Sequence, residues 1–318
     1  MRVRFWGTRG SLPVALSHLA LKQKLEKALV RAAGKNLDTP EKARAFIENE
    51  LEVAISHTYG GNSSCVEIET GSDEYLLCDM GTGLREFSNN VSRARAGRPG
   101  VYHIFLSHVH WDHIMGFPFF MPAYISGNHI RIYGCHAVLE EALRRQYSAP
   151  WFPVDFSQLE ARIEFIRLEP GRSHDVAGFR VTPKLQLHSG DSYGYRFEKN
   201  KKTVVYSTDS EHRLEDEVAH QAFVDFFHDA DLVIFDAMYS LAESISVKQD
   251  WGHSSNIVGV ELCQSAHVKH LCMFHHEPAN DDENLTSILN ETRRLEEITR
   301  DQDVLKISAA YDGLEITV

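Results

Sequence analysis

The sequence lacks long apolar segments, paired cysteine motifs and an excess of basic residues. Its longest apolar runs, such as residues 232–235 and 116–124, are far shorter than the roughly 20 residues of a membrane-spanning helix, so no contact with a membrane is expected. Five cysteines are scattered without a CxxC pair, which favours buried free thiols over a disulfide framework. The first residues lack the apolar segment of a secretory signal, so we expect a cytoplasmic location.

The charge balance excludes a broad, sequence-independent grip on nucleic acid. The 45 acidic residues outnumber the 33 basic ones and give a formal net charge of −12. This balance is compatible with a small anionic substrate that is held through metal ions. The apolar share of 43% and the charged share of 25% are typical of a folded globular protein. No repeat and no flexible linker divides the chain, so residues 1–318 are expected to form a single domain.

Short β-like runs alternate with amphipathic helical patterns, which predicts an α/β domain with helices outside the sheets. Strands are expected at residues 3–6, 65–69, 75–79, 103–107, 130–133, 163–168, 179–187, 194–197, 203–207, 232–236, 271–274 and 304–308. Helices are expected at residues 138–147, 217–227, 255–266 and 282–298. Residues 14–57 carry two further helical patterns and read as an inserted helical hairpin. This hairpin could pack over an edge of the domain, form an interface between copies of the chain or cover an active site.

A histidine-rich loop follows the strand-like residues 103–106. His108 and His110 are two residues apart and share a face on leaving the strand, while the tightening loop brings Asp112 and His113 towards a second position. Eighteen histidines are present in the chain, and imidazole is the commonest metal ligand in proteins. The spacing of these four side chains therefore predicts a site for two metal ions.

Three further candidate ligands stand where expected strands end, namely His188, Asp209 and His275. Each of them alone could be an ordinary hydrogen-bonded polar residue at a strand end. Together with the histidine-rich loop they form a coherent ligand set. Asp209 is the best bridge, because a carboxylate can give one oxygen to each of two ions.

The chain resembles the metallo-β-lactamase superfamily, whose signature HxHxDH is matched by residues 108–113. The resemblance extends from residues 5–11 through residues 79–83 to the strand before His275, and it leaves only the helical insertion unmatched. It implies an αββα sandwich in which His108, His110 and His188 hold one metal ion, Asp112, His113 and His275 hold a second, and Asp209 bridges them. It also implies that Asp79 orients one of the ligands.

Within the superfamily the pattern is most similar to the ribonuclease Z and phosphodiesterase branch. Residues 251–255, Trp-Gly-His-Ser-Ser, resemble an element of that branch whose histidine lies beside the metals and serves as general acid or transition-state stabiliser. The resemblance therefore makes Asp112 and His253 the expected catalytic residues, although His253 could instead only stabilise its loop. The basic arm that binds tRNA in ribonuclease Z enzymes is absent, because residues 189–208 read as a hairpin with Asn200 at its turn.

Candidate substrate contacts are Asn62, Trp111, Trp151, Ser189, Tyr193 and His276. Asn62 belongs to a glycine-rich loop that could contact a phosphate or simply form a turn. Trp151 belongs to an aromatic, proline-stiffened segment that could stack on a base or pack into the core. Ser189 and Tyr193 lie close to His188 in the sequence.

These observations predict a binuclear metal-dependent hydrolase. We expect a phosphodiesterase acting on a small phosphodiester such as a cyclic nucleotide, with a metal-bridging hydroxide as nucleophile. Zinc is the expected metal, and manganese or iron would also suit a site with two carboxylates. The alternatives are hydrolysis of a carboxylic ester, lactone or thioester on the same site, and a metal-binding regulatory protein with negligible turnover. A homo-oligomer formed through the helical insertion is a further expectation.

Overall fold

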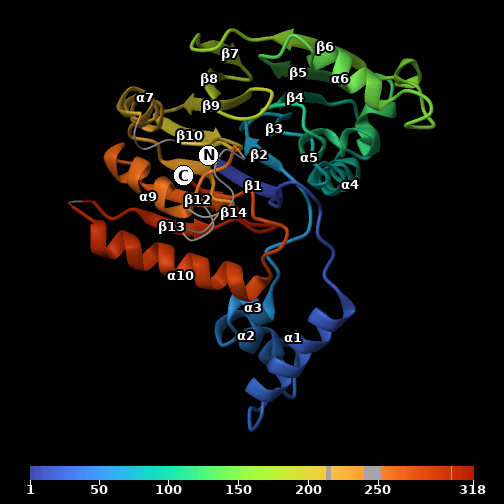
Figure 1. The fold of residues 1–318 in the computed structure, drawn as a ribbon. Helices are drawn as coiled ribbons and strands as arrows, with labels where there is room; N and C mark the ends of the chain where they lie inside the picture. The colour runs from blue at the N-terminus through green and yellow to red at the C-terminus, as the bar shows by residue number, and fades with distance from the viewer. Residues whose placement is uncertain (213–215, 240–251, 302) are drawn as a thin grey trace.

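The protein folds as two β-sheets packed face to face with helices on both outer surfaces (Figure 1). The computed structural model describes residues 1–212, 216–239, 252–301 and 303–318. Within these residues each sheet contains seven strands, in the orders β14-β1-β2-β3-β4-β5-β6 and β13-β12-β11-β10-β9-β8-β7. The expected α/β sandwich of the αββα type is confirmed.

The first sheet is antiparallel from β14 to β3 and parallel from β3 to β6. Its strands are β1 (Arg2–Gly7), β2 (Cys65–Glu69), β3 (Glu74–Cys78), β4 (Val101–Phe105), β5 (His129–Gly134), β6 (Arg162–Arg167) and β14 (Glu315–Thr317). The helices of this half are α4 (Gly83–Arg95), α5 (Trp111–Ile114), α6 (Leu139–Gln146) and the short 3₁₀ turns η1 (Phe117–Phe119), η2 (Met121–Tyr124) and η3 (Phe156–Gln158).

The second sheet is parallel from β10 to β13 and antiparallel from β7 to β10. Its strands are β7 (His174–Val176), β8 (Phe179–Gln186), β9 (Ser192–Lys199), β10 (Lys202–Ser207), β11 (Leu232–Asp236), β12 (His270–Phe274) and β13 (Lys306–Ala309). The helices α7 (Glu217–Phe227), α9 (Asn256–Ser265) and α10 (Asp282–Thr299) cover its outer face. The expected hairpin is present, because Asn200 and Lys201 form a two-residue turn with φ values of 52° and 60° between β9 and β10.

The buried apolar side chains form three layers, one between the two sheets and one between each sheet and its helices. The space between the sheets is filled by buried side chains such as Phe5, Phe105, Tyr195 and Phe274. Separate apolar clusters lie under the helices of each half. The five cysteines are all buried and free, as expected.

Helix α4 was not expected from the sequence. It has only three large apolar residues that face the core, Leu84, Phe87 and Val91, and they lie three and four residues apart on one side. The rest of the helix is polar, so its apolar pattern is too sparse to predict a helix. The helix is stabilised by its packing on the sheet more than by the helix propensity of its residues.

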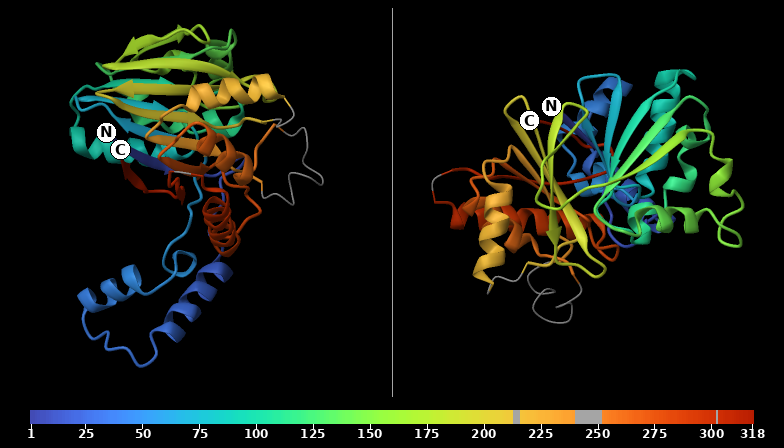
Figure 2. Two further views of the ribbon diagram at one scale, coloured as in Figure 1. Left: turned by 90° about the vertical axis from the view of Figure 1, so that its left-hand side faces the viewer. Right: turned by 90° about the horizontal axis from the view of Figure 1, so that it is seen from above.

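The helical insertion projects from the body of the protein (Figures 1 and 2). It contains α1 (His18–Arg31), α2 (Pro40–Asn49) and the short α3 (Val53–Ser56). Ser17 and Thr39 cap α1 and α2 by accepting hydrogen bonds from backbone N–H groups of the first turn. The two ends of the insertion meet, because the Val14 N–H donates to the Gly61 carbonyl over 2.7 Å. Across the described residues, no helix has the length and apolar character needed to cross a bilayer.

Candidate metal centre

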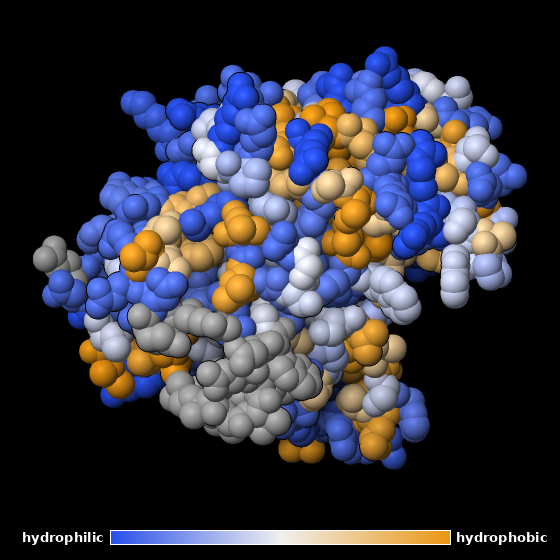
Figure 3. All heavy atoms as spheres, turned by 45° about the horizontal axis from the view of Figure 1, so that its top comes forward, coloured by the Kyte–Doolittle hydropathy of each residue, from blue (hydrophilic) through white to orange (hydrophobic). Residues whose placement is uncertain are grey.

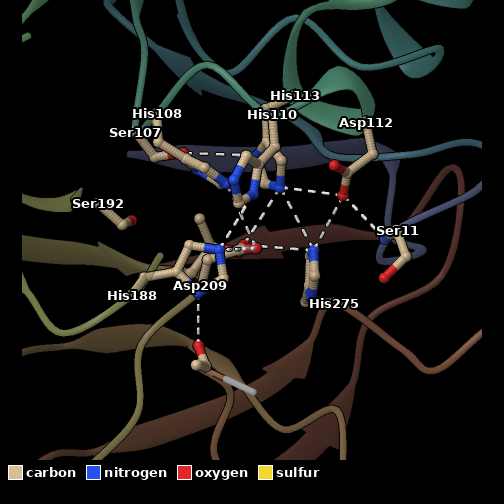
Figure 4. A network of polar contacts seen from close by, with 12 residues as sticks. Ser11, Ser107, His108, His110, Asp112, His113, His188, Ser192, Asp209 and His275 are labelled. Carbon is tan, nitrogen blue, oxygen red and sulfur yellow. Dashed lines mark hydrogen bonds and ion pairs between the residues drawn. The ribbon is translucent and has the colours of Figure 1, made fainter. Parts of the chain in front are cut away.

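The candidate ligands meet at one end of the two sheets because each follows a strand. The loop of residues 106–113 follows β4, His188 follows β8, Asp209 follows β10 and His275 follows β12 (Figure 4). Asp209 and His275 have left-handed backbones with φ values of 42° and 60°, and Asp79, which follows β3, has a φ of 61°. Such conformations cost free energy for residues other than glycine and are concentrated at functional sites.

One group of four side chains has the spacing of a tetrahedral metal site. The Nε2 atoms of His113 and His275 lie 3.3 Å apart, and each lies 3.2 Å from Asp112 Oδ2. Each also lies 3.2 Å from Asp209 Oδ1. Ligands about 2.0–2.1 Å from a tetrahedral zinc ion stand roughly 3.3 Å from one another. These five separations therefore match the edges of a zinc coordination tetrahedron.

A second group consists of His108, His110 and His188, whose ligand atoms lie within 4.8 Å of one another. His188 Nε2 is 3.1 Å from His110 Nδ1. Asp209 Oδ2 lies 3.6 Å from His108 Nε2 and 3.7 Å from His188 Nε2. Asp209 thus directs one carboxylate oxygen at each group, which is the arrangement that a bridging ligand requires.

Hydrogen bonds fix the orientation of several of these side chains. Asp79 is buried and accepts hydrogen bonds from His113 Nδ1 and the Tyr206 hydroxyl, each over 2.7 Å. His188 Nδ1 donates to the Gly252 carbonyl over 2.7 Å, and the Ser11 N–H donates to Asp112 Oδ2 over 2.8 Å. The contacts at Nδ1 of His113 and of His188 leave Nε2 of each ring directed into the centre, as in metal sites whose ligands are held by a surrounding shell.

The electrostatics of the centre favour cation binding. Burial opposes the ionisation of Asp209, but the neighbouring imidazoles, His113 first among them, outweigh burial and hold the pKa of the carboxyl well below its usual range. Burial likewise opposes protonation of His113, and the carboxylates around it outweigh burial and raise its pKa. Burial lowers the pKa of His108, which keeps that imidazole neutral. A cation bound here would replace the proton on His113, because imidazole coordinates metals in its neutral form.

His253 lies beside the centre and forms a pair with Asp236. His253 Nδ1 is 2.9 Å from Asp236 Oδ2, and its ring stacks on that of His275 at 5.0 Å. Burial opposes protonation of His253, but the charge and hydrogen bond of Asp236 raise its pKa to about 9. The sequence analysis did not identify Asp236. This residue is the last of strand β11, and the candidate ligands likewise stand where strands end. Trp251, the first residue of the expected His253 element, lies outside the described residues.

The candidate substrate residues fall into two groups. Trp111, Trp151 and Ser189 are exposed, and Trp111 follows His110, which is also exposed. The metal centre is therefore open to solvent on the side of His110.

The remaining three candidates are held by the protein itself. The Tyr193 ring packs on His136, and the Asn62 N–H donates to Asp312. His276 Nε2 contacts the Ala310 carbonyl over 2.8 Å, and burial lowers the pKa of His276 to about 4. Of the six candidates, the exposed three are thus the better placed to meet a ligand.

Comparison with known proteins gives the family. Residues 74–276, more than half of the chain, match the family described as the Beta-lactamase superfamily domain. The chain therefore belongs to the β-lactamase superfamily, as its resemblance indicated.

Individual relatives are distant. A ribonuclease Z from Thermoplasma acidophilum is 22% identical over 271 residues, covering 70% of this chain and 83% of the relative. The metallo-β-lactamase fold protein YhfI from Bacillus subtilis has a TM-score of 0.65 at 18% identity, with 99% of this chain and 98% of the other covered. A diphosphatase from the PhnP family has a TM-score of 0.59 at 18% identity, with 100% and 97% covered. At such identities the solved structures show the shared fold.

Gly10 is expected to be essential for the position of His275. A Cβ atom at residue 10 would lie 2.5 Å from the His275 ring, which is closer than any real contact. We expect Gly10→Ala to displace His275 and to lower metal content, measured by elemental analysis, while the fold measured by circular dichroism is retained. Gly34→Ala provides the control, because nothing lies within 4 Å of a Cβ there and the strain of its left-handed backbone, with a φ of 77°, falls in the insertion, which supplies none of the candidate ligands. Full metal content in Gly10→Ala would contradict this prediction.

The insertion is expected to be dispensable for metal binding, because residues 14–57 supply none of the candidate ligands. Since Val14 lies beside Gly61, a linker of about four to six Gly and Ser residues can join Val14 to His57 and span the distance. We expect the chain without residues 15–56 to bind as much metal as the full chain. A folded deletion variant that has lost its metal would contradict this expectation.

Proposed function

We propose that the protein is a binuclear metal-dependent hydrolase that cleaves phosphodiester bonds. The observation that carries the proposal is the tetrahedral spacing of Asp112, His113, Asp209 and His275, next to the pair formed by His253 and Asp236. A ligand cluster and an acid–base group side by side are the parts that hydrolysis requires. The relatives named ribonuclease Z and diphosphatase support a substrate with a phosphorus–oxygen bond to be cleaved.

The residues present fit two divalent ions. His108 Nε2 is buried without a hydrogen-bond partner within the protein, so a polar atom stands ready at the centre. We assign His108, His110 and His188 to one ion, Asp112, His113 and His275 to the other, and Asp209 to both. Zinc fits this imidazole-rich set best. When bound, such ions lower the pKa of water and neutralise charge on phosphoryl oxygens.

The chain's own side chains then have distinct roles. Asp79 and the Gly252 carbonyl keep His113 and His188 oriented. Asp236 occupies Nδ1 of His253, so the proton available to a leaving oxygen is the one on Nε2. Asp236 also favours the protonated form of His253, which suits a general acid at neutral pH.

A small substrate is favoured over an extended RNA. Of the three lysines of the β9–β10 hairpin, where a basic arm would be needed, two are engaged with the protein and Lys201 is exposed at the tip. Lys199 Nζ donates to the Thr70 carbonyl over 2.7 Å, and Lys202 forms an ion pair with Asp231 over 3.0 Å. With a net charge of −12, the chain offers little attraction to a polyanion. We therefore propose a small phosphodiester, such as a cyclic nucleotide, as the substrate.

A panel of substrates tests the proposal on protein whose metal content has been measured. The panel contains bis(p-nitrophenyl) phosphate, cyclic nucleotides, a p-nitrophenyl acyl ester and a lactone. We expect turnover of the phosphodiesters, loss of turnover with a chelator and recovery with zinc. Faster turnover of the ester or lactone would replace the proposed substrate class, and no turnover of any member by the metal-loaded protein would favour a regulatory metal-binding role.

A further inference from the structure

Ser11 lies at the edge of the metal centre and contacts it through its backbone. Its N–H donates to Asp112 Oδ2 over 2.8 Å, and Figure 4 shows the residue beside Asp112 and His275. The preceding residue, Gly10, packs on the His275 ring, since a Cβ at residue 10 would lie 2.5 Å from that ring. Residues 10–11 therefore form one wall of the four-residue tetrahedral group.

The backbone of Ser11 has an unfavourable conformation. Its φ is 57°, in the left-handed region, and the Leu12 N–H donates to the Gly10 carbonyl over 2.5 Å to close a tight three-residue turn. Glycine and asparagine adopt this region more readily than serine does. The serine side chain thus raises the cost of the turn, and strain of this kind is concentrated at functional sites.

The surrounding backbone holds the turn in place. The Gly10 N–H donates to the His276 carbonyl, and the His276 N–H donates to the Thr8 carbonyl, each over 3.0 Å. The N–H groups of Thr8 and Arg9 both donate to the Asn62 carbonyl over 2.9 Å. The position of the turn is therefore fixed by the protein and does not depend on a bound ligand.

The path of the chain into the insertion does not explain this serine. The turn precedes the insertion, which is the lobe at lower right in Figure 3. The start of that lobe is anchored separately, because the Val14 N–H donates to the Gly61 carbonyl over 2.7 Å. A glycine at residue 11 would serve the same path with less strain, so the path gives no reason for a side chain there.

The Ser11 side chain is exposed, and its hydroxyl forms no hydrogen bond with the residues that the structure describes. Two other hydroxyls next to the centre are instead committed to carboxylates. Thr208 Oγ1 donates to Asp209 Oδ1 over 2.6 Å, and Ser107 Oγ donates to Asp79 Oδ2 over 2.8 Å. Ser11 thus offers a free donor beside the ligands.

We propose that the Ser11 hydroxyl donates a hydrogen bond to a non-bridging phosphoryl oxygen of the substrate. A serine hydroxyl lies within about 4 Å of its own backbone nitrogen, so that of Ser11 is within about 7 Å of Asp112 Oδ2. A phosphoryl group that touches the centre with one oxygen can accept a hydrogen bond of about 2.8 Å from Ser11 with another. This inference rests on the proposed function and adds a substrate-binding residue to it.

A neutral hydroxyl suits this position. The non-bridging oxygens of a phosphodiester gain negative charge as a nucleophile attacks phosphorus, and a fixed donor beside them stabilises that charge. The carboxylates of Asp112 and Asp209 repel the same oxygens, whereas a hydroxyl donates at every pH at which the fold is stable. Ser11 and His253 then have different tasks, because His253 acts on the leaving oxygen.

Ser11→Ala and Ser11→Gly test the proposal in the full, zinc-loaded chain. Both remove the hydroxyl and keep the N–H that contacts Asp112, and Ser11→Gly also relieves the backbone strain. We expect both variants to retain the zinc content of the wild type and to lower kcat/KM for bis(p-nitrophenyl) phosphate by about 10- to 100-fold. The loss should be equal for a cyclic nucleotide, because both diesters carry the same non-bridging oxygens. Ser92→Ala, at an exposed position of α4, is the matched control and should behave as the wild type.

Calorimetric titration of the zinc-loaded protein with inorganic phosphate gives a readout that does not depend on turnover. We expect Ser11→Ala to bind phosphate about 10-fold more weakly than the wild type and Ser92→Ala do. A wild type that shows this difference but cleaves no phosphodiester would contradict the proposed function and leave the contact of Ser11 with a phosphoryl oxygen supported.

Four results would overturn the proposal. A wild type that binds no phosphate would remove the ligand from this position. Wild-type kcat/KM and phosphate affinity in Ser11→Ala would show that the hydroxyl makes no contact with the substrate. Loss of zinc from both variants would make Ser11 a support of the metal centre. A defect in Ser11→Gly that Ser11→Ala does not share would assign the effect to the backbone of the turn.

Discussion

Asp209→Ala is expected to lose metal affinity and catalytic turnover together. Asp209 directs oxygens at both ligand groups, so its removal deprives each of them of a carboxylate. The two bound cations would also repel each other more strongly without the negative charge between them. We expect the apparent affinity for the second ion to fall by at least about 100-fold and turnover of the phosphodiester to fall at least as much.

Elemental analysis and a zinc titration measure the first effect, and steady-state kinetics in saturating zinc measure the second. The wild type should contain two ions per chain. Asp175→Ala, which removes an exposed carboxylate from β7, is the control and should leave both quantities unchanged. One ion or fewer in the metal-saturated wild type would rule out the binuclear mechanism, and two tightly bound ions in Asp209→Ala would rule out the bridge.

His253→Ala is expected to lower turnover by about 10²- to 10⁴-fold while both ions remain bound. His253 takes part in neither of the two ligand groups assigned above, and its Nδ1 is committed to Asp236. The loss should be smaller for substrates with good leaving groups, because p-nitrophenolate needs little protonation and a ribose alkoxide depends on it.

A comparison of bis(p-nitrophenyl) phosphate with a cyclic nucleotide separates a chemical role of His253 from a structural one. Asp236→Asn should show the same dependence on the leaving group in weaker form, because it removes the charge that holds the proton on His253. His267→Ala is the control, since this histidine is exposed. Equal losses on both substrates would leave His253 as a positioning residue only.

Much of the fold and of the centre could be predicted from sequence because both depend on strand ends. A strand that turns abruptly into a polar loop is visible as a pattern, and residues that follow neighbouring parallel strands meet at one edge. This rule predicted that His108, Asp209 and His275 lie near one another, and their side chains do so in the structure. Asp236 also stands at a strand end. It was not predicted as a site residue because it closes an otherwise apolar strand, and its partner His253 lies 17 residues further along the chain.

Other features depend on tertiary contacts that leave no local pattern. The face that α1 turns to the body is set by Lys24 and Lys27 meeting acidic residues more than 250 residues away. Helix periodicity shows that such a helix has an apolar side, but it does not show which side is covered. The role of Gly10 likewise becomes visible only when His275 is placed beside it.

The left-handed backbones of Asp79, Asp209 and His275 lower the stability of the metal-free protein. Each of these conformations costs of order 1–3 kcal/mol, and the buried charges beside them add to the cost. Together these costs are a substantial part of the free energy of unfolding of a typical protein, which is about 5–15 kcal/mol. Metal ions that bind only the folded chain offset this cost, because their binding shifts the equilibrium toward the folded state. In a metal-starved cell the amount of folded protein, and not only its activity, is therefore expected to fall, because proteases remove the unfolded fraction.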